Sequence, residues 1–163
     1  MGFSLADFTT ANFTTKFALP MKEHTNQEIV DAFNAACPGT LMETLNITYV
    51  EADADRGILV ATMPVDSRVY QPMQILHGGA TVALAESVGS AASLMLIDPK
   101  REAAVGAEIS ANHLKSARTG LLRATAECVH RGRSSHLFHI RVENEQGELI
   151  SMVKLLNFIK QRK

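Results

Sequence analysis

The second half of the chain alternates apolar and polar residues with a period of two, which is typical of strands that bury one face. Positions 122, 124, 126 and 128 are apolar, and the positions between them are mostly polar. Residues 136–143 repeat this pattern, with Phe138, Ile140 and Val142 on the apolar face. The runs at 103–115 and 149–159 are β-rich as well. Because turn-forming residues separate these runs, we expect four strands.

The first half of the chain predicts a short helix followed by a hairpin. A capping-box pattern at 25–28 (TNQE) begins a helix with one apolar face, and the residues CPG at 37–39 end it. Residues 44–52 and 58–65 are rich in β-forming side chains and flank a turn. We expect these two segments to pair as a β-hairpin.

A long helix is predicted between the hairpin and the last four strands. After a loop at 66–76, the helical period runs from Gly79 to about Ile97, and the next two residues, Asp98 and Pro99, end it. One main helix then accompanies about six strands, which argues against the alternating order of a parallel, Rossmann-like sheet. We predict an α+β fold in which an antiparallel sheet packs its apolar face on this helix.

The chain length and composition indicate one globular domain. The chain has 163 residues, of which 46% are hydrophobic and 20% are charged. This length is typical of a single domain with one core. We place that domain at 25–163 and expect an irregular arm at 1–24, which is rich in Thr and Phe and lacks a clear period.

Charge and cysteine usage exclude several function classes. A formal net charge of −1 provides no strong field for nucleic acid or for an anionic membrane. No apolar stretch approaches the roughly 20 residues of a membrane helix, and Asp7 interrupts any signal peptide. The two cysteines, Cys37 and Cys128, are far apart and lack metal-ligand spacing. We therefore expect a reduced, cytoplasmic protein without partners among nucleic acids or membranes.

The histidines do not predict a metal site. His136 and His139 resemble an H-x-x-H pattern, but positions three apart on a strand point to opposite faces. His77 and His113 are too widely separated in the sequence to propose a ligand set. We expect neither a metal nor another resident cofactor.

The long helix carries one glutamate among small residues. Ala and Ser predominate around Glu86, which would allow strands to approach the helix axis closely. Leu84, Val88 and Met95 belong to an apolar stripe, whereas Glu86 shares its face with Gly89, Ser90 and other residues. Two interpretations stay open: Glu86 lies on a solvated face of an amphipathic helix, or it is a functional carboxylate.

The start of the helix has the features of an anion site. Gly78 and Gly79 lack side chains where a helix N-terminus presents free N–H groups, and His77 precedes them. Such groups stabilise a developing oxyanion, although the two glycines are also explained by a tight turn. Glu86 follows Gly78 by eight residues, about 12 Å along a helix axis. One substrate atom cannot touch both groups of one helix, which suggests a site shared between subunits.

Five motifs together resemble the hotdog-fold acyl-CoA thioesterases. They are similar to the branch of the Arthrobacter-type 4-hydroxybenzoyl-CoA thioesterase, which includes 1,4-dihydroxy-2-naphthoyl-CoA thioesterases of menaquinone biosynthesis. The resemblance runs from about residue 28 to 160 and does not cover the arm. The motifs are MPVDSR (63–68), QP (71–72), LHGGA (76–80), LAESVGS (84–90) and ISANHLKSAR (109–118).

This resemblance implies a fold, an assembly and a set of catalytic residues. The fold would be a sheet wrapped around one long helix, in homodimers and commonly tetramers. Glu86 would be the catalytic carboxylate, either as nucleophile or as general base for water. Gln71 would hold substrate or water, and Gly78 N–H would polarise the thioester carbonyl with His77 beside it. Ser90 would hydrogen-bond the carboxylate or the leaving sulfur.

The resemblance also implies where coenzyme A, as part of the substrate, would bind. Basic residues in these segments would attract its phosphates, although charged residues at a solvated sheet edge are also ordinary. The implied contacts are Gly106, His113, Leu114, Lys115, Ser116, His130, Arg131, Gly132, Arg133, Ser134 and Ser135.

Thioester chemistry is compatible with so few groups. A thiolate is a good leaving group because free thiols ionise near neutral pH, so little general acid is needed. No G-x-S-x-G motif is present to support a serine triad. We predict an acyl-CoA thioester hydrolase for an aromatic or medium-chain acyl group. A non-catalytic acyl-CoA-binding hotdog module and a hotdog hydratase are the alternatives.

Overall fold

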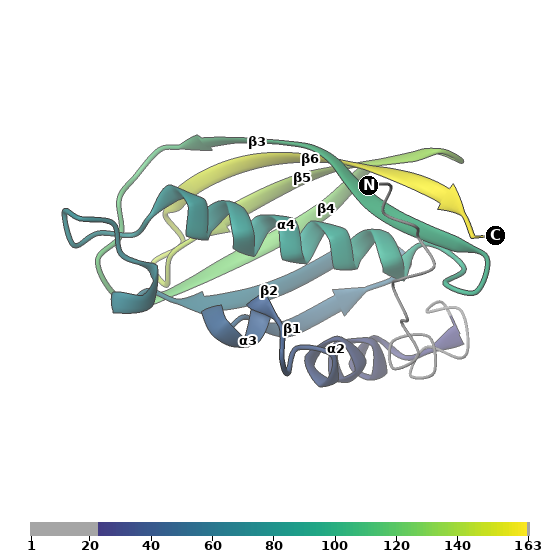
Figure 1. The fold of residues 1–163 in the computed structure, drawn as a ribbon, viewed down its shortest axis with the longest axis horizontal. Helices are drawn as coiled ribbons and strands as arrows, with labels where there is room; N and C mark the ends of the chain where they lie inside the picture. Colours follow the sequence, from purple (N-terminus) through teal and green to yellow (C-terminus); the bar gives the residue numbers. More distant parts are fainter. Residues whose placement is uncertain (1–22, 163) are drawn as a thin grey trace, which may run out of the picture.

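The computed structural model describes residues 23–162, which form one antiparallel sheet, one long helix and two shorter helices (Figure 1). The predicted arm at 1–24 therefore lies outside the described residues, apart from its last two positions. The helices are α2 (Asn26–Ala35), α3 (Leu41–Leu45), the 3₁₀ helix η3 (Ser67–Val69) and α4 (Gly78–Met95). The strands are β1 (Thr48–Asp53), β2 (Ile58–Pro64), β3 (Glu102–His113), β4 (Leu121–Arg131), β5 (Ser135–Glu143) and β6 (Leu149–Gln161).

The six strands pair in the order β1-β2-β4-β5-β6-β3, and every pair is antiparallel. Helix α4 lies along one face of the curved sheet, while α2 and α3 lie beside β1 and β2 (Figure 1). This arrangement confirms the predicted α+β hotdog fold. It also leaves β3, a strand of 12 residues, at one edge of the sheet, with no partner on its outer side among residues 23–162.

The period-two pattern places the apolar side chains against α4. Leu122, Ala124 and Ala126 on β4 are buried, and so are Phe138, Ile140 and Val142 on β5. The charged residues between them are mostly exposed. Burial of this apolar area is the main stabilising contribution to the fold.

Small residues on α4 allow the sheet to approach closely. A Cβ atom on Gly89 would lie 2.6 Å from Leu155 Cδ2 and 2.9 Å from Ile140 Cδ1. Leu84, Val88 and Met95 are buried, as their apolar stripe predicted. The buried surface extends further round the helix than one stripe, because Gly89 and Ser93 are buried as well.

Helix α3 was not predicted, and the expected strand at 44–52 was wrong in its first residues. Glu43 accepts a hydrogen bond from Gly39 N–H at 2.7 Å, which stabilises the start of the helix. Asn46 ends it in the left-handed region with φ 55°, where Asn is tolerated, and β1 begins at Thr48. A single helical turn between two loops is too short to show a period in the sequence.

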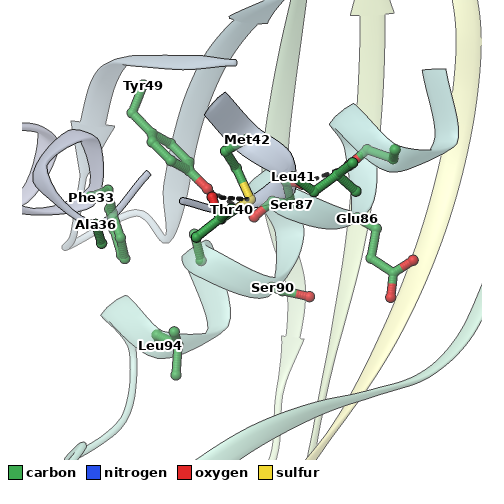
Figure 2. A pocket seen from close by; sticks show the side chains of 12 residues that line it. Phe33, Ala36, Thr40, Leu41, Met42, Tyr49, Glu86, Ser87, Ser90 and Leu94 are labelled. Atoms are coloured by element: carbon green, nitrogen blue, oxygen red, sulfur yellow. Dashed lines mark hydrogen bonds between the residues drawn. The ribbon is translucent and has the colours of Figure 1, made fainter. Parts of the chain in front are cut away.

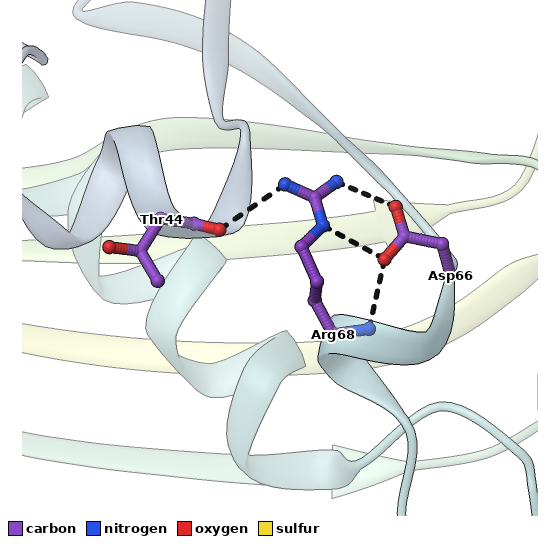
Figure 3. A network of polar contacts seen from close by, with 3 residues as sticks. All are labelled: Thr44, Asp66 and Arg68. Atoms are coloured by element: carbon purple, nitrogen blue, oxygen red, sulfur yellow. Dashed lines mark hydrogen bonds and ion pairs between the residues drawn. The ribbon is translucent and has the colours of Figure 1, made fainter.

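An ion-pair network anchors the loop before α4. Arg68 donates from Nη2 and Nε to the Asp66 carboxylate at 2.6 and 3.0 Å, and from Nη1 to Thr44 O at 3.3 Å (Figure 3). The side-chain hydrogen bonds from Arg68 lower the pKa of Asp66 to about 2. The network connects η3 to the end of α3 and so anchors the start of the loop that leads to α4.

None of the helices in residues 23–162 is long and apolar enough to span a membrane. In the same residues, no group of three or more His, Cys, Asp or Glu side chains is arranged to hold a metal ion. His136 is buried and His139 is exposed, so these two histidines do point to opposite faces of β5.

Candidate active site

The N-terminus of α4 has one free amide next to a capped one. His77 is the N-cap residue, and its Nδ1 accepts a hydrogen bond from Gly79 N–H at 2.8 Å. Gly78 N–H makes no hydrogen bond with any described residue. The helix dipole and this free N–H together favour a negative oxygen at Gly78.

The ring of His113 packs directly on Gly78. A Cβ atom on Gly78 would lie 2.6 Å from His113 Nε2, so a larger residue there would displace the ring. Ser151 Oγ donates to Asn112 O at 3.1 Å and lies 3.1 Å from His113 Nδ1. Because a hydroxyl has only one proton, Nδ1 is the donor in this second contact. The structure thus places His113, which was predicted to contact coenzyme A, against Gly78, which was predicted to bind the thioester carbonyl.

Gln71 belongs to the tight loop that leads into the same helix end. Its Oε1 accepts from Met73 N–H at 2.9 Å, and its backbone pairs with Ile75 at 2.9 Å. Its amide NH₂ makes no hydrogen bond with a described residue, so it is free to donate. The loop is closed by a bridge between Tyr70 and Leu76.

Glu86 lies two turns further along α4, beside the edge strand. It is exposed, whereas Gly89 and Ser93 on its face are buried, so this face is not a solvated one along its length. A Cβ atom on Gly106 of β3 would lie 3.0 Å from Glu86 Oε1. All residues from Gly78 to Glu86 are helical. Gly78 and Glu86 are therefore about 12 Å apart along the helix axis, as predicted.

A cavity of about 420 Å³ lies next to Glu86 and Ser90, between α4 and the segment of α2, α3 and β1. Its walls are mostly apolar, from Phe33, Ala36, Leu41, Met42, Ala91 and Leu94. Glu86 projects from α4 on the far side of the cavity from Phe33 and Ala36 (Figure 2). The Ser90 hydroxyl makes no hydrogen bond with the Glu86 carboxylate or with another described side chain. An apolar group that filled this cavity would end close to the Glu86 carboxylate.

Three other hydroxyl groups in the cavity donate to backbone carbonyls of the chain. Tyr49 donates to Ser87 O at 3.2 Å, Thr40 donates to Cys37 O at 2.5 Å, and Ser87 donates to Ala83 O at 2.7 Å. Burial raises the pKa of the Tyr49 phenol, so it remains protonated. Asn34 holds this wall in place, because its side chain pairs with both backbone groups of Tyr49 at 2.8 Å.

The residues predicted to contact coenzyme A lie at opposite ends of α4 in one chain. His113 ends β3 and packs on Gly78, and Leu114, Lys115 and Ser116 follow it in the chain. The turn from His130 to Ser135 lies at the other end, where Arg131 donates to Leu96 O at 2.5 Å. Gly106 lies between them, beside Glu86. One chain does not bring the two groups together, and their assignment stays a prediction.

Two of the basic residues in these groups already have partners. Lys115 forms an ion pair with Glu148 at 2.7 Å. Arg131 lines a second cavity of about 370 Å³ with Asp55, Asp98 and Glu102. Arg133 and Ser134 are exposed in the turn.

Sequence reasoning missed the contacts that shape this region. The cavity wall from α3 was not predicted, and neither was the contact of His113 with Gly78. The two glycines, Gly78 and Gly106, were themselves a signal in the sequence, because a side chain at either position would enter the site. The sequence did not show that the neighbouring side chains are His113 at Gly78 and Glu86 at Gly106.

The chain is similar to known proteins over the part of the sequence that contains Gly78 and Glu86. The family model of the thioesterase superfamily matches residues 73–151. The chain is 39% identical over 130 residues to the 1,4-dihydroxy-2-naphthoyl-CoA hydrolase of Escherichia coli, covering 80% of this chain and 93% of that one. This chain belongs to the thioesterase superfamily. The thioesterase is also 43% identical over 118 residues to the proofreading thioesterase EntH of Cronobacter turicensis, covering 72% of this chain and 84% of that one.

Solved structures agree with this family. The thioesterase resembles a mutant of thioesterase PA1618 from Pseudomonas aeruginosa, with a TM-score of 0.79 and 37% identity. That likeness covers 82% of this chain and 94% of the other. The thioesterase is thus an enzyme that hydrolyses thioesters, and its hotdog fold is that of its relatives.

Proposed function

We propose that this thioesterase hydrolyses an acyl-CoA with an aromatic acyl group, of the 1,4-dihydroxy-2-naphthoyl or benzoyl type, or with a medium-chain one. Glu86 acts as nucleophile or as general base, and Gly78 N–H binds the carbonyl oxygen. The products are the free acid and coenzyme A. The observation that carries the proposal is the Glu86 carboxylate at the end of an apolar cavity of about 420 Å³.

The acyl group lies in the cavity beneath α2 and α3. Its apolar walls match an aromatic ring or a short chain, and the thioester carbonyl then lies close to Glu86. Ser90, which lines the cavity next to Glu86, is free to donate a hydrogen bond to the carboxylate or to the sulfur. The name of the Escherichia coli relative supports an aromatic acyl group, and a role in menaquinone biosynthesis is part of this proposal.

Two chains form each site. β3 is a long strand with an unpaired outer edge, which is a template for pairing with a second copy. Antiparallel pairing of two β3 strands about a twofold axis lays two α4 helices side by side. Glu86 of one chain then faces the Gly78 amide and Gln71 of the second chain. A further pairing of dimers gives the tetramer that the resemblance implies.

The same pairing accounts for the separation of the predicted coenzyme A contacts. Two antiparallel helices place the C-terminal end of one beside the N-terminal end of the other. The segment 113–116 of one chain and the turn 130–135 of another then flank one substrate. We expect coenzyme A to enter with the substrate, with no resident cofactor, and we expect the enzyme in the cytoplasm.

The proposal is tested by measuring thioester cleavage with a thiol reagent for the wild type, Glu86→Gln and Glu86→Ala. Loss of the general base or nucleophile lowers kcat by at least about 10²-fold. The Gln variant is the matched control for shape, because it keeps the size of the side chain without its charge. Near-wild-type turnover by both variants would overturn the assignment of Glu86.

A substrate screen defines the acyl group. We expect turnover of naphthoyl-, benzoyl- or phenylacetyl-CoA, or of medium-chain fatty acyl-CoA, and mass analysis of the products as the free acids. Tight binding of every ester without cleavage would instead indicate a non-catalytic binding module, and a mass gain on an intact thioester would indicate a hydratase.

A further inference from the structure

Asn157 on β6 has a buried acceptor without a partner. The residue is 0% exposed, and its Nδ2 donates to Gly89 O at 3.3 Å and to Ser93 Oγ at 3.1 Å. In the described part of the chain, its Oδ1 is buried and has no hydrogen-bond partner. Buried polar atoms in proteins are nearly always paired, so this oxygen requires an explanation.

The chemistry of its neighbours fixes the orientation of this amide. The carbonyl of Gly89 can only accept, so the NH₂ group of Asn157 must face it. Ser93 Oγ lies 2.9 Å from His136 Nδ1 and can donate its one proton to that nitrogen. Burial lowers the pKa of His136, which keeps this nitrogen available as an acceptor. The Oδ1 atom of Asn157 therefore points away from the Gly89 carbonyl and the Ser93 hydroxyl.

This oxygen and the Glu86 carboxylate both lie near Gly106 of β3. Asn157 and Gly106 are partners across β6 and β3, so their side-chain positions share one face of the sheet. A Cβ atom on Gly106 would lie 3.0 Å from Glu86 Oε1 and 3.8 Å from Asn157 Oδ1. Both oxygens are thus within 3.8 Å of one point, at which Gly106 has no side chain.

Only the protonated form of Glu86 can form a hydrogen bond with Asn157 Oδ1. An ionised carboxylate is purely an acceptor, and so is Asn157 Oδ1. A protonated carboxyl group has one O–H and can donate it. Among the side chains at this point, Glu86 is the one that changes from acceptor to donor when it takes up a proton.

We propose that Asn157 is a positioning residue for Glu86, whose carboxyl group donates a hydrogen bond to Asn157 Oδ1 while it carries the proton taken from the hydrolytic water. This inference rests on the proposed function and assigns Glu86 the role of general base. The water oxygen bonds to the thioester carbon while one water proton passes to Glu86. The C–S bond then breaks with its electron pair on sulfur, and Glu86 returns the proton to the sulfur. The products are the acid and coenzyme A thiol.

Asn157 favours the proton transfer because a hydrogen bond to the neutral form of an acid disfavours its charged form. Asn157→Leu removes the acceptor at similar volume. We expect kcat to fall about tenfold with KM unchanged, and the acidic limb of the kcat/KM profile to move to lower pH by roughly one unit. Asn157→Asp keeps an acceptor oxygen in place and adds charge when ionised. Its acidic limb is expected at the wild-type pH or above.

Ser93→Ala is the matched control, because it disturbs the same buried cluster but leaves Oδ1 and its surroundings intact. We expect a lower melting temperature and an unchanged acidic limb. The inference is overturned if Asn157→Leu keeps the wild-type limb, if both Asn157 variants move it downward, or if Ser93→Ala moves it as far as Asn157→Leu does. Circular dichroism confirms that each variant is folded.

Failure of this inference is distinguishable from failure of the proposed function. If wild-type enzyme cleaves acyl-CoA, Glu86→Ala does not, and the Asn157 variants keep the wild-type pH profile, only the role of Asn157 is wrong. If Glu86→Ala keeps wild-type turnover, the assignment of Glu86 as the catalytic carboxylate and this inference are both wrong. If the wild-type enzyme cleaves no acyl-CoA, the proposed function itself is wrong.

Discussion

At the scale of single residues, His77 has a structural task that its place beside Gly78 did not reveal. Its Nδ1 accepts from Gly79 N–H, so the ring caps the helix whose next amide is free. An imidazole that accepts at Nδ1 must be unprotonated there. Capping therefore requires His77 without a proton on Nδ1, and a substrate that contacts His77 meets the ring in this form.

Removing this cap is expected to destabilise the enzyme. His77→Ala leaves Gly79 N–H without its acceptor and should lower the free energy of unfolding by about 1 kcal/mol. His77→Asn restores a short capping acceptor and should regain most of that loss. Urea denaturation at pH 7 measures both, and equal stability of the Ala variant and the wild type would contradict the capping role.

His136 gives the fold a dependence on pH. Desolvation by burial lowers its pKa from 6.5, and the nearby Arg131 adds to the shift, with a smaller contribution from His130, while Glu102 opposes it. The unfolded chain then binds a proton at a higher pH than the folded chain does. The contribution of neutral His136 to the free energy of unfolding is therefore complete above about pH 6.5. It is lost as the pH falls through the lowered pKa that His136 has in the folded chain.

A comparison of His136→Gln with the wild type tests this dependence. The Gln side chain can still accept from Ser93 but does not titrate. We expect the free energy of unfolding of the wild type to fall more steeply between pH 7 and pH 5 than that of the variant. Parallel curves from chemical denaturation would contradict a neutral, buried His136.

At the scale of elements, α4 is matched to the sheet by its small residues. Gly89 faces Leu155 and Ile140 with no room for a methyl group. In an exposed helix, Gly→Ala is stabilising by up to about 1 kcal/mol. Here we expect Gly89→Ala to destabilise the enzyme by about 1 kcal/mol or more, because overpacking costs about 1–3 kcal/mol. A variant more stable than the wild type in thermal unfolding would contradict this close packing.

The strands and the long helix could be predicted from the sequence because each repeats one period over many residues. The alternation in β4 and β5 and the capping box before α2 were sufficient to locate those elements, and α4 begins within one residue of its expected start. Helix α3 has five residues and one turn, so it offers no period to detect. Its position depends on the left-handed Asn46 and on the bond from Gly39 to Glu43.

The candidate site was predictable only in part, for a similar reason. Gly78 and Glu86 stand out by residue type in one continuous stretch, and Gln71 was assigned by the family resemblance. Asn157 lies near Glu86, and His113 lies against Gly78, through the register of strands that are distant in the sequence. Register of this kind depends on tertiary packing and is not encoded in a local motif.

At the scale of the whole molecule, the edge strand β3 lies beside the part of α4 that carries Glu86. Within the described part of the chain, β3 leaves an unpaired row of backbone groups, and Glu86 lies beside Gly106 of this strand. In the proposed dimer, a substitution that prevents pairing at this edge is expected to reduce turnover without any change in the catalytic groups of one chain.

Glu86 follows Gly78 by eight residues along α4, and this separation leads to a test in which two variants are mixed. Glu86→Ala chains lack the carboxylate, and Gly78→Val chains lose a usable amide because the new side chain meets His113. Each homodimer should be inactive. When the two are unfolded together and refolded at equal amounts, half of the dimers pair one chain of each kind and contain one intact site. Roughly a quarter of the wild-type sites should then return, whereas a site confined to one chain would recover nothing.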